Sequence, residues 1–335
     1  MKLKKLIICN RHFILLAALG IIMRILGMIY LIPLSDVYYF NTKGVIDLLS
    51  LKNPYEDRFD DFVPNSLMTP NSGNIYAYMP LETLYLIPFY LTFGDIRYGN
   101  VFADIVIACL LYNMISYKKW RWLAVNIYLI FPLIFLTEIL YSSHTNIAAL
   151  FLLLSFFLLK RGKEILFSFT YGMALASSQL TFISLPFIIA LWIKRKLMKK
   201  FVLCFIPLFL TIIPFFIINY QEFLKDVMFF QFSRETYPLF ERRGNVLISN
   251  FGLNGIFYTL TGFDLPISLR LALSILPLLF FIINLDFTFE KILRTISISS
   301  FLIIFILPKN LFLIYFLVYL PLLLLIIDKF FKKFY

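Results

Sequence analysis

Charged residues are scarce in this 335-residue chain, and acidic residues are scarcer than basic ones. Only 15% of the residues are Asp, Glu, Lys or Arg, whereas 61% are hydrophobic. A soluble domain of this length needs far more polar surface to cover its core. The composition therefore excludes an ordinary water-soluble domain and predicts that much of the chain lies in lipid.

Cysteine and histidine are also rare, with three and two residues respectively. The cysteines (Cys9, Cys109 and Cys204) lie in or beside apolar segments and are odd in number, so no disulfide framework is predicted. The sequence has no metal-ligand spacing, no glycine-rich phosphate loop and no Gly-x-Ser-x-Gly elbow. We therefore expect no metal site and no cofactor.

The chain contains instead a succession of apolar runs of roughly 17–25 residues, a length that crosses a hydrocarbon core of about 30 Å. The first run is too long for a cleavable signal peptide and carries Arg24. The runs predict an all-α, polytopic transmembrane helical bundle in which residues 1–335 form a single transmembrane domain. About ten helices are expected, near residues 12–34, 97–117, 122–140, 144–159, 165–178, 180–193, 201–219, 266–284, 292–307 and 311–328.

The basic residues set the orientation of these helices. A formal charge of +12 also occurs in proteins that bind nucleic acid, but bases flanking membrane helices are the commoner source. With the N-terminus inside, most of the 31 Lys and Arg residues fall in short cytoplasmic segments. We therefore predict both termini inside, contact with membrane lipids and no nucleic-acid partner.

Two apolar segments do not fit a simple crossing. Residues 80–93 form a run of about 21 Å as a helix, too short for an easy span, so a juxtamembrane or re-entrant helix is expected. Residues 165–193 are too long for one crossing, and two short helices meeting near Gln179 keep the flanking bases inside.

Two long segments remain on the outer side, residues 35–95 and 220–265, and long loops on a compact scaffold are usually functional. The first is rich in acids and begins with Asp36, which suits a general base or a metal ligand. The alternative is an ordinary acid at a helix end. Deeper in the bilayer, Arg24 needs a partner, and Asp104 lies at a matching depth, so we predict a structural pair.

Further candidate residues are weaker. Glu138 and His144 flank a short outer turn, and Gln179 falls at the outward tip, where it either caps backbone groups or faces a substrate. Guanidinium groups pair with phosphate oxygens in fork geometry. Three arginines in the second outer loop suit phosphate recognition, with lipid head groups as the alternative: Arg234, Arg242 and Arg243.

The order of several short motifs resembles one family. Asp36, Asn53-Pro-Tyr and Tyr76-Ala-Tyr-Met-Pro-Leu resemble the first luminal loop of GT-C polyprenyl-phosphate-sugar-dependent glycosyltransferases. The likeness is greatest to the catalytic subunit of the first mannosyltransferase of glycosylphosphatidylinositol assembly and to its prokaryotic relatives. It continues through Ala103-Asp-Ile, Phe131-Pro, Ser142-Ser-His-Thr-Asn, Tyr171-Gly-Met-Ala-Leu-Ala-Ser-Ser-Gln, Phe229-Phe-Gln-Phe-Ser-Arg-Glu, Pro308-Lys-Asn and Tyr319-Leu-Pro.

The sequence departs from that family at two positions. The family member shows an Asp-x-Asp pair after its first helix, whereas this chain reads Asp36-Val-Tyr38, which disfavours a two-carboxylate metal site. Relatives often have a basic residue where this chain has Gln179, which leaves Arg234, Arg242, Arg243 and Lys309 as the cationic candidates.

The resemblance implies transfer of a hexose, with mannose favoured, from a polyprenyl-phosphate sugar to a lipid-linked or other glycan acceptor. Asp36 would deprotonate the acceptor, the cationic residues would hold the leaving phosphate, and the anomeric configuration would invert. Tyr38, Tyr55 and Tyr78 would frame the sugar, with His144 and Gln179 as further substrate contacts. The membrane would be a plasma membrane or an endoplasmic reticulum, with the active site on its non-cytoplasmic face. A transporter or flippase of lipid-linked sugars is the main alternative, and a non-catalytic assembly subunit is a third.

Overall fold

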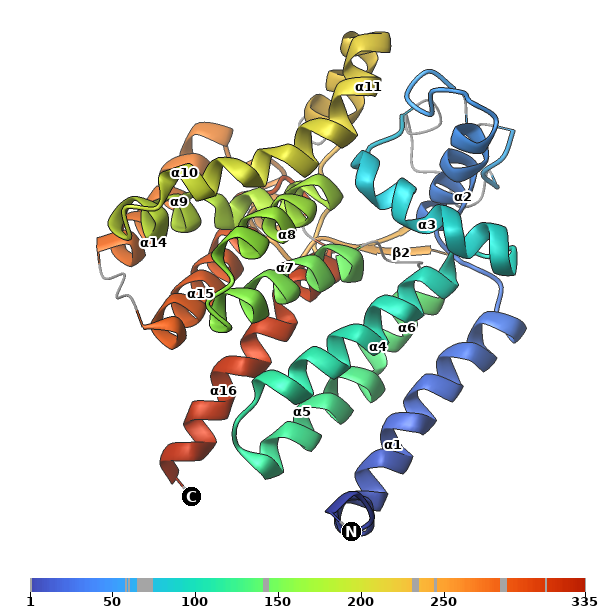
Figure 1. The fold of residues 1–335 in the computed structure, drawn as a ribbon. Helices are drawn as coiled ribbons and strands as arrows, with labels where there is room; N and C mark the ends of the chain where they lie inside the picture. Colours follow the sequence, from blue (N-terminus) through green and yellow to red (C-terminus); the bar gives the residue numbers. More distant parts are fainter. Residues whose placement is uncertain are drawn as a thin grey trace.

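The chain folds into a helical bundle, for which we describe a computed structural model (Figure 1). The structure describes residues 2–57, 59, 61–64, 75–140, 145–230, 235–243, 246–283, 288–310 and 312–334. The helices outside the two long outer segments are α1 (Lys2–Tyr30), α4 (Arg97–Met114), α5 (Lys118–Ile130), α6 (Pro132–Ile139), α7 (Thr145–Lys160), α8 (Glu164–Ser177), α9 (Leu185–Lys194), α11 (Phe205–Leu224), α14 (Ile267–Ile283), α15 (Phe289–Ile306) and α16 (Leu320–Phe334).

Shorter elements join these helices. The first outer loop contains α2 (Asp36–Leu49) and α3 (Pro80–Phe93), and the second contains η3 (Lys225–Phe229), β1 (Phe240–Arg243), β2 (Val246–Ser249) and α13 (Leu253–Thr261). The remaining short turns are η1 (Gln179–Ser184), α10 (Met198–Phe201), η2 (Val202–Cys204) and η4 (Leu313–Val318). Figure 1 places both ends of the chain at one end of the bundle, and α2, α3 and the end of α11 at the other.

Apolar side chains on the outer surface of the bundle identify the face that meets lipid. Leu15 on α1 is 64% exposed, and Ile217 on α11 is 76% exposed. Many neighbouring large apolar residues on α1, α11 and α14 are also exposed. Contiguous apolar surface of this kind marks contact with another apolar phase. The structure is therefore a helical bundle whose apolar outer surface suits contact with lipid.

Two helical stretches in the described part of the chain are long and apolar enough to cross a membrane unaided, Arg11–Tyr30 and Met198–Phe229. Shorter apolar helices include Thr145–Lys160, Gln179–Lys194 and Ile267–Ile283. The number of about ten crossings therefore stays a prediction.

Proline and backbone breaks decide where the predicted helices end. The single helix predicted over residues 122–140 is wrong, because Phe131 is extended (ψ 120°) and Pro132 begins α6 as a separate helix. Proline disfavours the helical conformation in the residue before it. The first helix ends at Tyr30 instead of residue 34, ahead of Pro33. Two helices do occur within residues 165–193, because α8 ends at Ser177 and η1 follows an extended Ser178.

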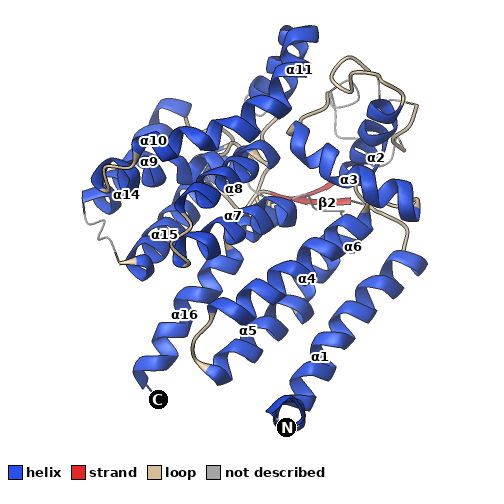
Figure 2. Cartoon of the chain, in the orientation of Figure 1, coloured by secondary structure: helices blue, strands red, loops and turns tan. Residues whose placement is uncertain are grey.

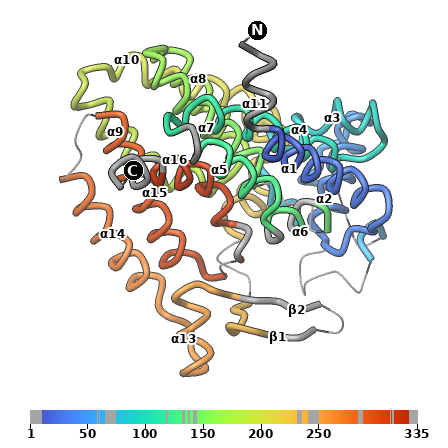
Figure 3. The backbone as a smooth tube through the Cα atoms, turned by 90° about the horizontal axis from the view of Figure 1, so that it is seen from below, coloured from blue at the N-terminus to red at the C-terminus, as the bar shows by residue number. Residues whose placement is uncertain are grey.

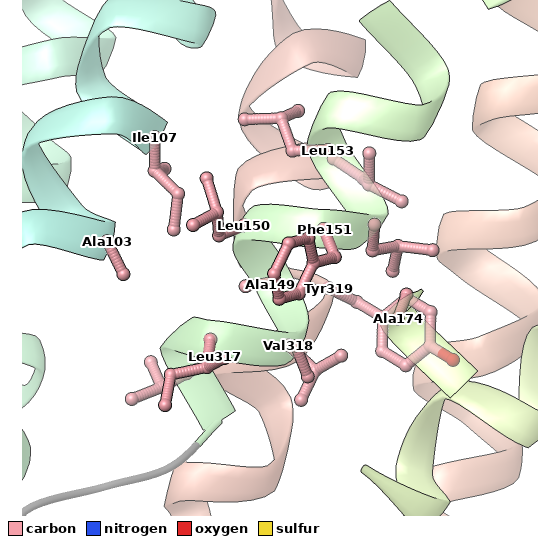
Figure 4. Packing of buried hydrophobic residues seen from close by; sticks show 14 of the residues in the cluster. Ala103, Ile107, Ala149, Leu150, Phe151, Leu153, Ala174, Leu317, Val318 and Tyr319 are labelled. Atoms are coloured by element: carbon pink, nitrogen blue, oxygen red, sulfur yellow. The ribbon is translucent and has the colours of Figure 1, made fainter. Parts of the chain in front are cut away.

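The core lies where α4, α7, α8 and η4 meet (Figure 4). Figure 4 shows Ile107, Leu150, Ala174 and Leu317 contributing to one cluster of buried side chains. Among the glycines that the structure describes, the tightest approach is at Gly172 on α8, where an added Cβ would lie 1.9 Å from the carbonyl oxygen of Cys204. Small residues at such positions let membrane helices approach closely.

Helix α1 also packs closely against the bundle at a glycine. A Cβ on Gly20 would lie 3.0 Å from the carbonyl oxygen of Leu129, so the absence of a side chain allows α1 to contact α5. That approach brings Arg24 of α1 to Asp104 of α4, and the Nε to Oδ2 distance is 2.9 Å. The sequence predicts this pair, and both side chains are fully buried.

A small antiparallel hairpin interrupts the otherwise helical chain (Figure 2). Phe240 pairs with Ser249 and Arg243 with Val246. The sequence predicts no strand in the second outer loop. Figure 3 shows the hairpin and α13 lying together at one side of the bundle, away from both termini.

Candidate functional site

Asp36 lies at the first residue of α2, at the end of the molecule opposite the termini. Its Oδ1 accepts hydrogen bonds from the backbone N–H of Val37 (2.9 Å) and from the Oγ of Ser35 (3.1 Å). Ser35 is the N-cap residue of the helix. The start of a helix favours a negative charge, because its backbone N–H groups are unsatisfied. Asp36 is partly exposed, so a carboxylate at this position has access to a ligand.

Arg97 fixes the segment that leads into Asp36. Its guanidinium donates to the carbonyl oxygens of Met28 (2.7 Å) and Leu31 (2.9 Å) at the end of α1, and it pairs with Asp95 at 2.7 Å. The same group lies 5.4 Å from the ring centroid of Tyr38. Burial and the nearby Asp95 carboxylate raise the pKa of Tyr38, although Arg97 opposes them. Tyr38 is therefore a neutral hydrogen-bond donor at physiological pH.

Tyr55 and Tyr78 have different surroundings. Tyr55 is 2% exposed, its hydroxyl donates to the Tyr78 carbonyl oxygen at 2.7 Å, and its ring lies 4.9 Å from that of Phe223 on α11. Its ring packs the first outer loop against α11 and is not open to a ligand. Tyr78 is half-buried, with its ring 5.3 Å from that of Tyr76.

The two long outer loops meet beside Gln179. Its Nε2 donates to the carbonyl oxygen of Ala77 in the first loop (2.9 Å) and to that of Val227 in the second (3.3 Å). The Tyr76 N–H donates to Asp226 Oδ2 at 2.8 Å, which joins the same two loops directly. The contact of Gln179 with both loops is not evident from sequence spacing, because the three segments lie far apart along the chain.

Beneath this junction lies a buried polar network. Glu82 is 1% exposed, and its Oε1 accepts a hydrogen bond of 2.8 Å from Asn41. The Tyr76 hydroxyl bonds to Asn41 Oδ1 at 3.1 Å and to Thr83 Oγ1 at 2.6 Å. Burial raises the pKa of Glu82 well above its ordinary value, although the Asn41 hydrogen bond opposes the shift. The network therefore holds the start of α3, and burial favours the protonated form of the Glu82 carboxyl group.

Replacing Glu82 tests that protonation state. A raised folded-state pKa means that the folded protein keeps a proton that the unfolded chain releases above about pH 4.5. This contribution to stability is complete below that pH and declines as the pH rises towards the folded-state pKa, by about 1.4 kcal/mol per pH unit. We expect Glu82→Gln to remove this decline. The unfolding midpoint of the variant should rise relative to that of the unmodified protein between pH 5 and 7, and a constant difference over that range would contradict the assignment.

Lys309 lies in the second outer region and is already paired. Its Nζ lies 3.3 Å from Asp264 Oδ2, and its backbone carbonyl accepts hydrogen bonds from Asn250 (3.1 Å) and Asn254 (3.0 Å). Asn310 Oδ1 accepts from the Tyr237 N–H at 2.9 Å. These amides hold the residues before β1, the start of α13 and the end of α15 together.

Several predicted residues lie outside the part that the structure describes. His144 and Arg234 are not among the described residues, and the side chain of Glu138 is not described either. Arg242 and Arg243 have described backbone in β1, with Leu247 and Val246 as partners, but not described side chains. The assignment of these arginines to the leaving phosphate therefore stays a prediction. The described residues include no group of three or more His, Cys, Asp and Glu side chains arranged as metal ligands.

The fold is thus a helical bundle with an apolar outer surface, in which Gln179 joins backbone carbonyls of two segments far apart in the sequence. No protein-family model and no curated protein matches the sequence. Among solved structures, two of ArnT from Cupriavidus metallidurans, one bound to undecaprenyl phosphate and one in the apo state, are similar, each with a TM-score of 0.57. The identities are 11% and 10%, and in both the match covers 97% of this chain but 60% of the ArnT chain. The likeness therefore concerns the fold, and this chain spans about 60% of the neighbour's length.

Proposed function

We propose that this protein is a polyprenyl-phosphate-dependent glycosyltransferase of the GT-C type, the class to which ArnT belongs. The observation that carries the proposal is the meeting of the two long outer loops beside Gln179, at the end of the bundle where α2 begins with Asp36. ArnT, which has a similar fold, was crystallised with undecaprenyl phosphate, and this lipid phosphate is the lipid part of such a sugar donor.

The proposed reaction is a single displacement at the anomeric carbon. The acceptor hydroxyl forms the new bond from its oxygen to that carbon, while the bond from the carbon to the phosphate oxygen breaks. The acceptor proton passes to Asp36, acting as general base. The lipid phosphate leaves with its charge, so it needs cations and not an acid, and we assign this role to Arg234, Arg242, Arg243 and Lys309. One displacement inverts the configuration at the anomeric carbon.

The finer assignments follow from the sequence motifs. We propose a hexose donor, most simply a mannosyl one, and a lipid-linked or glycan acceptor. Tyr38 and Tyr78 are the partly exposed aromatic residues that would border the sugar, whereas buried Tyr55 would support them from below. The site would face the non-cytoplasmic side of a plasma membrane or an endoplasmic reticulum.

The proposal is tested with the purified, lipid-reconstituted protein and a polyprenyl-phosphate mannose that carries a radiolabel in the sugar. Incubation with a membrane lipid extract should move the label into a new, covalently different product, and omission of the extract should prevent this. Recovery of intact donor in the opposite leaflet would instead indicate a transporter. If neither sugar transfer nor translocation of the donor is observed, both activities are refuted for this donor class.

A further inference from the structure

Asp264, in the loop between α13 and α14, is surrounded by donors from separate parts of the chain. Its Oδ1 accepts hydrogen bonds from Thr236 Oγ1 and from Asn254 Nδ2, which lies 3.3 Å away. Its Oδ2 lies 3.3 Å from Lys309 Nζ. A hydroxyl, an amide and an ammonium group therefore point at one carboxylate.

Two of the three donors belong to residues that are held by further contacts. Asn254 is fully buried, and its Oδ1 accepts a hydrogen bond of 2.7 Å from the Leu265 N–H, which orients the amide. The backbone of Lys309 is held by Asn250 and Asn254. The Lys309 side chain is 18% exposed, whereas that of Asp264 is 43% exposed. A ligand approaching from outside would therefore meet Asp264 first and the donors behind it.

The surroundings of Asp264 favour its negatively charged form. Partial burial raises the pKa of Asp264, but hydrogen bonds from Thr236 and Asn254 and the nearby Lys309 ammonium outweigh it and lower the pKa below its usual value. Phosphate oxygens accept hydrogen bonds from these same three donor types, and charge-assisted bonds to them are the stronger ones. The carboxylate thus occupies a position that a phosphate group also satisfies.

The surroundings of Asp264 indicate that such a phosphate comes from a lipid. Leu260 is 80% exposed and Phe263 is 75% exposed, and both lie within four residues of Asp264. Exposed apolar side chains next to a charged group suit the layer between lipid chains and head groups. A free phosphate in water gains nothing from these side chains, whereas a lipid phosphate keeps its chain against them.

We propose that Thr236, Asn254 and Lys309 form a phosphate cradle that Asp264 fills in the unliganded protein, and that the phosphate of a polyprenyl lipid displaces the carboxylate. The inference rests on the proposed function, which supplies this lipid as donor and product. In this proposal Asp264 competes with the lipid phosphate for the same donors. Thr236 and Asn254 join Lys309 as residues that bind the phosphate. Partly exposed ion pairs are weak, so the exchange is reversible.

The cradle is tested by binding of undecaprenyl phosphate to the purified, full-length protein in lipid nanodiscs, without any sugar. Asp264→Asn removes the competing charge and should tighten binding roughly twofold to fivefold, the range expected for a weak ion pair. Lys309→Met should weaken binding, and the double variant should bind less tightly than Asp264→Asn. Glu222→Gln is the matched control, because it frees Lys225 from a similar pair of 2.6 Å elsewhere in the outer region.

The outcomes separate this inference from the proposed function. Unchanged or weaker binding by a folded Asp264→Asn protein would overturn the cradle, as would equal tightening in Glu222→Gln. Asp264→Ser gives the same test if the Asn variant does not fold. Inorganic phosphate should compete only weakly, and equal binding of both ligands would refute the lipid as the source. If the variants change lipid affinity as expected but no sugar transfer is detected, the phosphate cradle is supported and the transferase activity is refuted.

Discussion

Asp36→Asn should lower the rate of sugar transfer by about 10²–10⁴-fold, the contribution that general bases typically make. The amide oxygen still accepts the hydrogen bond from the Val37 N–H, and the Ser35 cap is unchanged, so α2 should form normally. Because a base acts mainly in the transition state, kcat should fall while KM changes little. The measurement is steady-state transfer of label from polyprenyl-phosphate mannose, with the unfolding midpoint recorded on the same preparation.

Asp61→Asn is the matched control for that experiment. Asp61 is an exposed acid in the same outer loop, so its replacement makes the same change in charge without touching the start of α2. Transfer by this variant should stay within about twofold of that of the unmodified protein, as surface substitutions away from a site have small effects. Full activity in Asp36→Asn would exclude Asp36 as the base, and an equal loss in both variants would indicate an effect of net charge.

The sequence predicted best the features that depend on local pattern or on the cost of burial. The run from Pro80 to Phe93 forms the expected short helix α3, because Pro80 suits its first turn and Gly94 ends it in the left-handed conformation. Arg24 required a partner in the apolar interior, and Asp104 was the acid at a matching depth. Both inferences use information within one helix or one hydrophobic layer.

The contacts that build the site depend instead on tertiary structure. Gln179 joins backbone carbonyls of both outer loops, and nothing in its local sequence specifies those partners. Asp264 meets Lys309 through the packing of α13 against α15, 45 positions apart in the sequence. The pairing of β1 with β2 is also unpredicted. The strand β1 contains Glu241 and Arg242 side by side, so its sequence lacks the alternation of apolar and polar side chains that indicates a strand. Pairing in such a strand is set by its surroundings more than by propensity.

Arg24→Ala and Asp104→Ala should each destabilise the protein strongly. Arg24 Nε donates to Asp104 Oδ2 at 2.9 Å, Tyr128 donates its hydroxyl to Asp104 Oδ1 at 2.8 Å, and both members of the pair are fully buried. Removing one member of a buried pair takes away the opposite charge of the other and costs about 3–5 kcal/mol. In an apolar bilayer such a charge is especially unfavourable.

The double variant should lose much less than the sum of the single losses, because neither charge remains. We expect a coupling free energy of about 2 kcal/mol or more from a double-mutant cycle of unfolding in detergent. The pair of Lys200 and Glu164, at 2.7 Å and partly exposed, is the control, and its coupling should not exceed about 1 kcal/mol. Additive losses for Arg24 and Asp104 would mean that the two residues act independently. In that case the position of α1 in the bundle would depend on packing such as that of Gly20 against Leu129 of α5, and the ion pair would not be what fixes the helix that leads into Asp36.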